Sequence, residues 1–284
     1  MSAIDVASTD RIEPASAASH ELWLRTAGQL RQRELIGWVE RAVAAGDKVL
    51  LCQSVATSAQ RWLAEAGIDV GLLASGQLEV VAAQGLYDTT KGRHEALRAA
   101  HVECIERAHG EGYRAVSLTS DGRALHTLAP DDDELLLHEH DLDKLTRDYP
   151  LQVLCRYDPQ QERNGFLTQL VGTHWRHLRS DTWAAVCDEN GLSVHGEIDI
   201  ANADRLATVL HTATLDAVTT VDLSDVSFLS AQAVTALTDV ADLLHRRGGC
   251  LTLLNPSRHV GRMVQRFDLD RNPAIRVVEK GGAP

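Results

Sequence analysis

Short apolar runs alternate with longer helical patterns along the first two thirds of the chain, and this alternation limits the available folds more than any other feature. Apolar residues recur at helical spacing in the ranges 21–45, 57–66, 91–109, 131–148 and 165–178. Between these ranges lie the apolar runs 49–52, 78–81, 115–118 and 151–155. Strands that alternate with helices are joined by crossovers, so the sequence predicts an α/β domain with a mostly parallel sheet over residues 19–180.

The pattern changes near Arg179-Ser180-Asp181, where we expect a domain boundary. Beyond it, Asn190-Gly191 separates two short apolar runs, which is a strong signal for a β-hairpin. The later elements are expected as helices over 201–214, 231–247 and 257–267 and as strands over 219–223, 251–254 and 275–278. This order predicts a second, smaller α/β domain over residues 182–280.

Charge and cysteine usage exclude several classes of protein. The net charge of −12 argues against a protein that binds nucleic acid through its phosphates or docks on an anionic membrane. No run approaches the ~18 apolar residues of a membrane helix. Residues 1–18 are polar and small, so we expect a disordered tail and not a signal peptide. The five cysteines are odd in number and widely spaced, which favours reduced thiols in a cytoplasmic protein.

The second domain carries two informative stretches. In residues 221–233 an apolar strand leads through Asp222-Leu223-Ser224 into an acidic, hydroxyl-rich stretch that we interpret as a loop, and a helix follows. Together with residues 194–199, this stretch resembles the STAS domain of anti-sigma factor antagonists, in which Val226 and Phe228 would anchor the loop. The resemblance implies docking onto a partner protein, an anti-sigma factor or a related kinase-like protein. The expected partner-binding residues are Asp199, Asp222, Ser224, Asp225, Ser230, Ala231 and Gln232.

The phosphorylation site of such domains is altered here. The serine that the family phosphorylates falls on Ala231, which has no hydroxyl group. Ser230 is the remaining candidate for phosphorylation, because a phosphate at a helix N-terminus would add about two negative charges next to backbone N–H groups. The favoured interpretation is nevertheless that Ser230 is only the N-cap of the helix expected over 231–247.

The first domain resembles the MEDS sensory domain, a relative of the recombinase-type and circadian-clock-type ATPases. The resemblance rests on His20, residues 46–52, residues 76–80 and residues 154–158, and it implies the sensing of a small organic molecule. The chain contains no GxxxxGK[ST] motif, and Gln53-Ser54-Val55 follows the strand where an active relative carries acidic residues. Because ligands bind beyond the carboxyl ends of parallel strands, the expected pocket residues are Gln53, Ser54, Tyr87, Cys155, Tyr157 and Asp158.

Two pairs of residues have the spacing of metal ligands on a helix, His174 with His177 and His101 with Cys104. Neither pair has further ligands in a tight motif, so the sequence predicts no metal site and no cofactor. The favoured function is a non-enzymatic signalling regulator. The alternatives are a nucleotide-binding RecA-like protein with little or no ATPase activity, and an assembly role in which the chain forms homo-oligomers.

Overall fold

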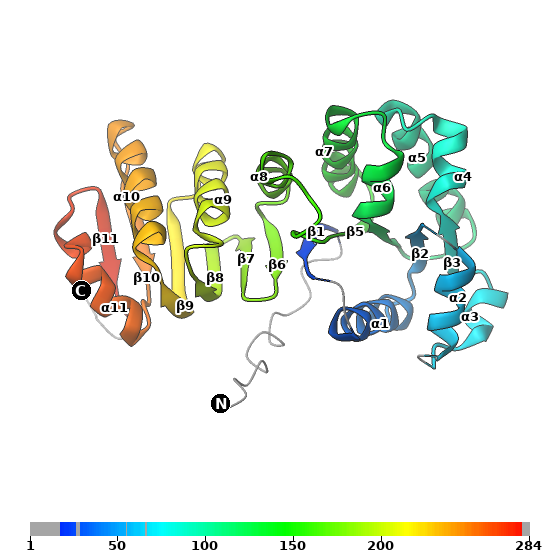
Figure 1. The fold of residues 1–284 in the computed structure, drawn as a ribbon, viewed down its shortest axis with the longest axis horizontal. Coiled ribbons are helices and arrows are strands. Elements are labelled where there is room, and N and C mark those ends of the chain that lie inside the picture. The colour runs from blue at the N-terminus through cyan, green and yellow to red at the C-terminus, as the bar shows by residue number, and fades with distance from the viewer. Residues whose placement is uncertain (1–17, 27–28, 55, 66, 280–284) are drawn as a thin grey trace. The chain divides into compact units, whose positions relative to one another are not determined.

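The computed structural model describes residues 18–26, 29–54, 56–65 and 67–279 (Figure 1). All but the last residue of the expected disordered tail, residues 1–18, lies outside this part of the chain. The described chain forms two compact units, with the boundary between Thr173 and His174. Within the described residues, no helix combines the length and the apolar character that crossing a membrane requires.

The first unit is built on a parallel sheet, as the alternation of strands and helices predicted. Its strands pair in the order β1-β5-β4-β2-β3, and every pair is parallel. The strands are β1 (Ser19–Leu24), β2 (Lys48–Gln53), β3 (Leu78–Ala82), β4 (Val116–Asp121) and β5 (Leu151–Tyr157). The helices are α1 (Gln29–Ala44), α2 (Ala56–Glu65), α3 (Val70–Ala74), α4 (Ala83–Thr90), α5 (His94–Gly110), α6 (Gly122–Leu128), α7 (Asp132–Asp148) and α8 (Asn164–Thr173).

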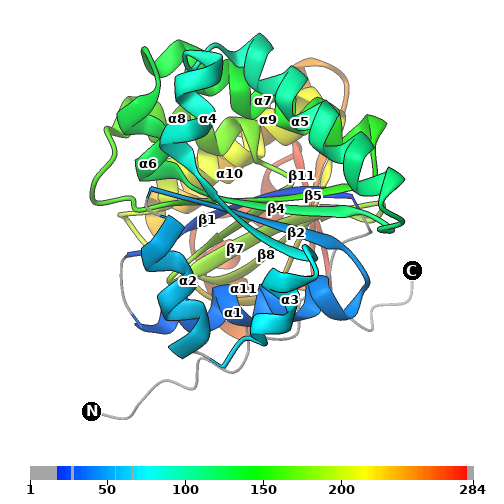
Figure 2. The ribbon, with the colours of Figure 1, turned by 90° about the vertical axis from the view of Figure 1, so that its right-hand side faces the viewer.

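The two faces of this sheet are covered by different helices, and the difference places the candidate site. Helices α1, α2 and α3 lie on one face, and α4 to α8 lie on the other (Figure 2). On the α1 side, Trp23, Val39, Leu51 and Leu154 belong to one apolar core cluster. Because side chains alternate along a strand, the neighbours of these core residues on β1 and β5 face α7 instead.

The helix predicted over residues 21–45 begins later than expected, which corrects the sequence analysis. Residues 19–24 form the strand β1, which pairs in parallel with β5. This segment is short and buried on both faces, so its apolar residues carry no clean period that would distinguish a strand from a helix. The helix predicted over 165–178 likewise ends at Thr173, and residues 177–180 form a strand.

The second unit has a mixed sheet. The strands β6 (His177–Ser180), β7 (Trp183–Asp188) and β8 (Gly191–Ile198) pair antiparallel, and the β7–β8 hairpin at Asn190-Gly191 is confirmed. The strands β9 (Thr220–Leu229), β10 (Leu251–Leu254) and β11 (Ile275–Val278) continue the sheet in parallel. Helices α9 (Ala203–Leu215) and α10 (Ala231–Arg246) lie on one face, and α11 (Arg258–Arg266) lies on the other (Figure 2). A 3₁₀ turn spans Leu269–Arg271.

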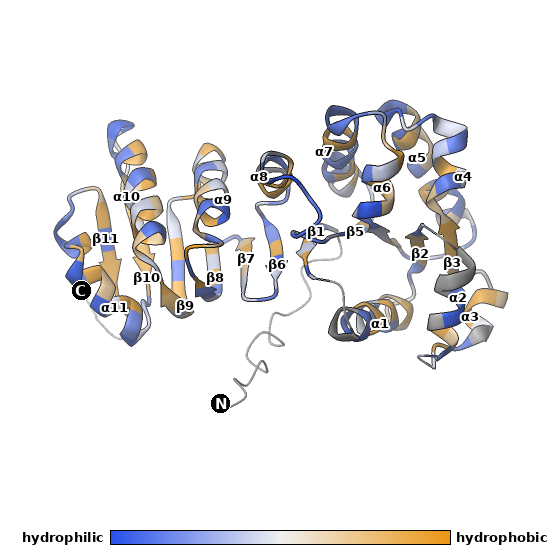
Figure 3. Ribbon diagram, viewed as in Figure 1, coloured by the Kyte–Doolittle hydropathy of each residue, from blue (hydrophilic) through white to orange (hydrophobic). Residues whose placement is uncertain are grey.

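Strand β9 is longer than predicted, because the stretch interpreted as a loop after Leu223 continues as strand to Leu229. Its pairing with β8 shifts register between Ser193 and His195 and again between Gly196 and Glu197. At each shift β9 gains one residue relative to β8, which is the geometry of a β-bulge. From Leu223 onward the buried residues of β9 therefore recur every third position, at Leu223, Val226 and Leu229, and not every second. Figure 3 shows apolar residues along the strands of both units.

Candidate functional site

An apolar cavity lies in the first unit between the sheet and the helices α5 and α7. It has a volume of about 80 Å³. Most of its wall is aliphatic, and the remainder is made of thiol, hydroxyl and imidazole groups. The lining residues are Leu50, Cys52, Val81, Leu86, Ala100, His101, Cys104, Leu118, Ser120, Leu125, His138 and Leu142.

The titratable side chains of this wall are uncharged near neutral pH. Burial raises the pKa of the Cys52 thiol to about 12. Burial lowers the pKa of His101, although a hydrogen bond with the Leu97 carbonyl opposes the shift. Burial, with a smaller contribution from His101, lowers the pKa of His138 to about 3, and the two imidazole rings stack at a centroid distance of 5.2 Å. The wall therefore suits a neutral, mainly apolar molecule and offers no cation to an anionic one.

A buried polar cluster adjoins the cavity on the α7 side of the sheet. The carboxylate of Glu139 accepts hydrogen bonds from the Tyr157 hydroxyl at 2.6 Å and from the Cys155 thiol at 3.0 Å, and His20 Nε2 lies 3.2 Å away. Burial, followed by the neighbouring Glu139 charge, raises the pKa of both Cys155 and Tyr157 far above their ordinary values. Ser120, which lines the cavity, contacts the Cys155 sulfur at 3.9 Å. Cavity and cluster thus share a wall.

The six predicted pocket residues are divided among different places. Cys155 and Tyr157 belong to the polar cluster, and none of the six lines the 80 Å³ cavity. Tyr87 is buried on α4, and its hydroxyl has no hydrogen-bond partner among the described residues. Asp158 is buried at the end of β5, where its carboxylate accepts hydrogen bonds from the Gln160 amide and the Gln161 side chain. The remaining two, Gln53 and Ser54, follow β2, with Gln53 half-buried and Ser54 exposed.

In the second unit, two of the predicted partner-binding residues, Asp199 and Ser230, accept hydrogen bonds from backbone amides just before or at the start of a helix. The Asp199 carboxylate accepts hydrogen bonds from the amides of Ala201 and Asn202 at 2.9 and 3.2 Å. The Ser230 hydroxyl accepts one from the Ala233 amide at 3.3 Å, so Ser230 is the N-cap of α10. The interpretation of Ser230 as an N-cap is confirmed, while its phosphorylation stays a prediction.

The other predicted partner-binding residues lie on β9 or open α10. Asp222 is half-buried, and its carboxylate accepts a hydrogen bond from the Ser224 amide at 2.8 Å. Asp225 is exposed and pairs with His195 at 3.2 Å. Ser224 is exposed, as are the two residues that open α10, Ala231 and Gln232. Because the Ser230 amide donates to the Ile198 carbonyl at 2.8 Å, the end of β8 and the start of α10 are held side by side.

Two exposed apolar side chains adjoin this surface, and the sequence analysis did not identify them as exposed. Ile200, directly after Asp199, is 71% exposed, and Phe228 on β9 is 49% exposed. Phe228 was expected to anchor a loop together with Val226. Only Val226 is buried, because the second bulge turns Phe228 outward and places Leu229 in the core.

Comparisons with known proteins identify both units. Residues 19–175 match the family model of the MEDS domain, described as the methanogen/methylotroph, DcmR sensory domain. Residues 185–279 match the model described as Mlab, STAS domain. A solved structure of a putative anti-sigma factor antagonist from Thermotoga maritima is similar over 34% of this chain and 86% of its own, at 18% identity and a TM-score of 0.30. A comparison with curated proteins finds no match. Both predicted resemblances are confirmed.

Proposed function

The chain belongs to the MEDS family, and from this premise we propose that it is a non-enzymatic signalling regulator of the anti-sigma factor antagonist kind. The first unit senses a small, mainly apolar molecule, and the second unit, a STAS domain, binds a partner protein. The description of the matched family as a sensory domain supports the first half of this proposal. All five cysteines are free thiols in the structure, which fits a role in the cytoplasm.

The observation that carries the proposal is the apolar cavity beneath α5 and α7. Ligand sites are mainly apolar hollows with a few polar groups for orientation, and Ser120 and His101 provide such groups here. An engineered cavity of ~150 Å³ lined by similar residues holds benzene or xenon. A cavity of about 80 Å³ suits a smaller molecule with only a few non-hydrogen atoms. Short-chain alcohols and halocarbons are the chemical class that fits.

Ala100→Leu is expected to abolish ligand binding, because the larger side chain would fill the cavity that Ala100 lines. Wild-type protein should be stabilised by xenon or by short-chain alcohols and halocarbons. One-site binding predicts about 2.7 kcal/mol of stabilisation at a ligand concentration 100 times the dissociation constant. The measurement is thermal unfolding of the wild type and the variant with each probe, supported by xenon NMR.

Ala99→Leu is the matched control, because Ala99 precedes Ala100 on α5 but is exposed and does not line the cavity. This variant should respond to the probes as the wild type does. No response of the wild type to any probe would contradict the sensing function, as would an unchanged response of Ala100→Leu. Stabilisation by ATP with magnesium alone would support the nucleotide-binding alternative instead.

The second half of the proposal places the partner on the exposed end of the β8–β9 pair. The Asp199 carboxylate and the exposed side chains of Ile200 and Phe228 lie here, Asp225 lies further back along β9 beside His195, and Asp222 lies near the start of β9. An acidic surface with apolar contacts suits a partner whose surface is basic and apolar in turn. The proposed partner is an anti-sigma factor or a related kinase-like protein. The start of α10, with half-buried Ser230 and exposed Ala231 and Gln232, would border the contact.

Ile200→Lys is expected to weaken partner binding at least about 10-fold, because it removes an apolar contact and adds a charge that repels a basic partner. The measurement is the dissociation constant of the full chain with a kinase-like anti-sigma factor that co-purifies with it. Leu215→Lys is the matched control, since Leu215 is 57% exposed but lies at the opposite end of α9. Equal losses in both variants, or none in Ile200→Lys, would move the docking surface elsewhere.

A further inference from the structure

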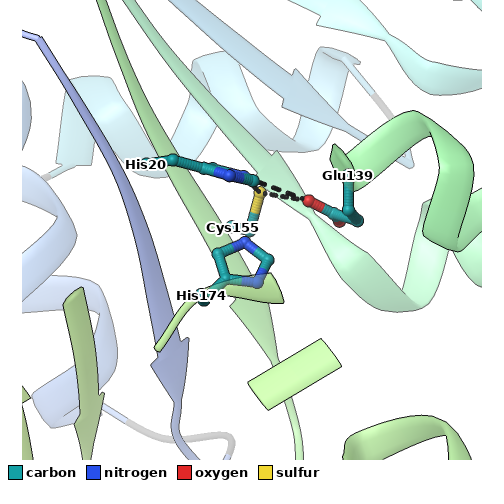
Figure 4. Close-up of side chains that lie close together, drawn as sticks. All are labelled: His20, Glu139, Cys155 and His174. Carbon is teal, nitrogen blue, oxygen red and sulfur yellow. Dashed lines mark hydrogen bonds and ion pairs between the residues drawn. The ribbon is translucent and has the colours of Figure 1, made fainter. Parts of the chain in front are cut away.

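Four buried side chains with metal-binding atoms converge in the polar cluster beside the cavity. They are His20, Glu139, Cys155 and His174, and one ligand atom from each lies within 4.8 Å of all the others. Figure 4 shows the side chains gathered around the Cys155 sulfur. They come from β1, α7, β5 and the residue that directly follows α8. The sequence offers no motif for this set, because its members are far apart along the chain.

The distances within the set are close to those of a tetrahedral metal site. His20 Nε2 lies 3.2 Å from Glu139 Oε2 and 3.4 Å from Cys155 Sγ, and the sulfur lies 3.0 Å from the same carboxylate oxygen. Zinc binds nitrogen and oxygen at about 2.0–2.2 Å and sulfur at about 2.3 Å, so tetrahedral ligands are separated by about 3.3–3.7 Å. An ion would therefore require the three atoms to move apart by about 0.2–0.6 Å, most between the sulfur and the carboxylate oxygen.

The donor types indicate which ion would bind. Imidazole nitrogen, thiolate sulfur and carboxylate oxygen together suit zinc and its first-row neighbours. Magnesium and calcium require several oxygen ligands, and this set provides only the carboxylate of Glu139. A divalent ion would also balance the charge of the site, because the Glu139 carboxylate and a Cys155 thiolate carry two negative charges between them. Binding would replace the thiol proton, which would leave to solvent.

Tyr157 is not one of the four side chains, but its hydrogen bond to Glu139 fixes how that carboxylate is oriented. Its hydroxyl donates to Glu139 Oε1 at 2.6 Å, while the other carboxylate oxygen, Oε2, faces the sulfur and the imidazole. Metal sites use outer hydrogen bonds of this kind to fix the orientation of a ligating carboxylate. Oε2 is thus held towards the centre of the set and is the oxygen that would bind an ion.

We propose that His20, Glu139 and Cys155, all in the first unit, bind one zinc-type divalent ion. The site is distinct from the ligand cavity, with which it shares the wall at Ser120. Because its ligands come from β1, α7 and β5, the ion would tie the first strand of the unit to the middle of its fold. The site is almost fully buried, so the ion would enter as the chain folds.

The test is production of the full chain in a medium supplemented with cobalt, which occupies zinc sites and gives a thiolate-to-cobalt absorption band. We expect one cobalt ion per chain, measured by elemental analysis, together with this band. Cys155→Ala should lose the band and the stoichiometric metal. Cys52→Ala should keep both, because Cys52 is equally buried in the same unit but lies outside the set.

Cys104→Ala is a second control, since Cys104 with His101 is the other sequence pair that could bind metal. Absence of stoichiometric cobalt or of the thiolate band in the wild type would overturn the proposal. Loss of the band in Cys52→Ala or Cys104→Ala would do so too, because the thiolate would then be elsewhere. These readings use the wild type and the controls, so they hold even if Cys155→Ala does not fold. The ligand response of the wild type can be measured in the same samples and fails or succeeds separately.

Discussion

Glu139→Ala is expected to lower the free energy of unfolding of the first unit by about 3–5 kcal/mol in protein prepared without metal. The carboxylate is fully buried and accepts hydrogen bonds from the Tyr157 hydroxyl and the Cys155 thiol. Each donor left unsatisfied after the substitution costs about 1–3 kcal/mol. The cavity left by the missing side chain adds to that cost.

Chemical denaturation monitored by hydrogen exchange would measure this change, since exchange in peptides from β5 and α7 reports on the first unit alone. Glu103→Ala is the control, because Glu103 is exposed on α5, and its loss should change stability by less than about 0.5 kcal/mol. Glu139→Gln keeps the shape and one carbonyl oxygen, so it should fall between the two. A loss below about 1 kcal/mol in Glu139→Ala would show that the cluster does not depend on this carboxylate.

Much of the fold follows from local patterns in the sequence. The alternation of strands and helices, the Asn190-Gly191 turn and the start of α10 at Ser230 were all predicted and are confirmed. These features depend on neighbouring residues, such as a turn that needs positive φ or a hydroxyl that caps a helix. The missed features depend on distant ones. Strand β1 is defined by its pairing with β5, more than 100 residues away, which no local period reveals.

The candidate site was predictable only in part, for a related reason. The rule that ligands bind at the carboxyl ends of strands pointed to Cys155 and Tyr157, and both lie in the buried polar cluster. The cavity itself lies further back, under helices that cover the middle of the sheet, with Leu50 and Leu118 in its wall. Which helix covers which part of a face is decided by packing. The approach of His20 to Glu139, 119 residues apart in sequence, is equally a product of the fold.

The surface of the second unit shows the same limit. The second bulge inserts one residue into β9 after Val226 and reverses the orientation of the residues that follow. Regular alternation from buried Val226 would bury Phe228, but Phe228 is exposed. The proposed docking surface gains its apolar character from this reversal. The sequence signal was present in the three-residue spacing of Leu223, Val226 and Leu229, which fits neither a regular strand nor a loop.

Gly196→Ala is expected to destabilise the second unit by about 3 kcal/mol or more, and to weaken partner binding with it. Gly196 has a φ of +86°, a conformation that residues with a side chain rarely adopt. An added Cβ would also overlap the Thr182 carbonyl oxygen, which accepts a hydrogen bond from the Glu197 amide at 2.9 Å. That oxygen belongs to the backbone of the residue directly before β7, so it cannot move aside without disturbing the start of the β7–β8 pairing.

Hydrogen exchange of β7 and β8 peptides would measure the loss, and Gly261→Ala supplies the control in the same unit. Gly261 lies inside α11, where an added Cβ meets nothing within 4 Å. Alanine there should be neutral or stabilising by up to about 1 kcal/mol, since it favours the helix more than glycine does. Strand β8 ends at Ile198, so a loosened hairpin would also release Asp199 and Ile200 from their places on the proposed docking surface. Unchanged exchange in Gly196→Ala would mean that the hairpin adapts to a side chain at this position, and that the docking surface does not need this glycine.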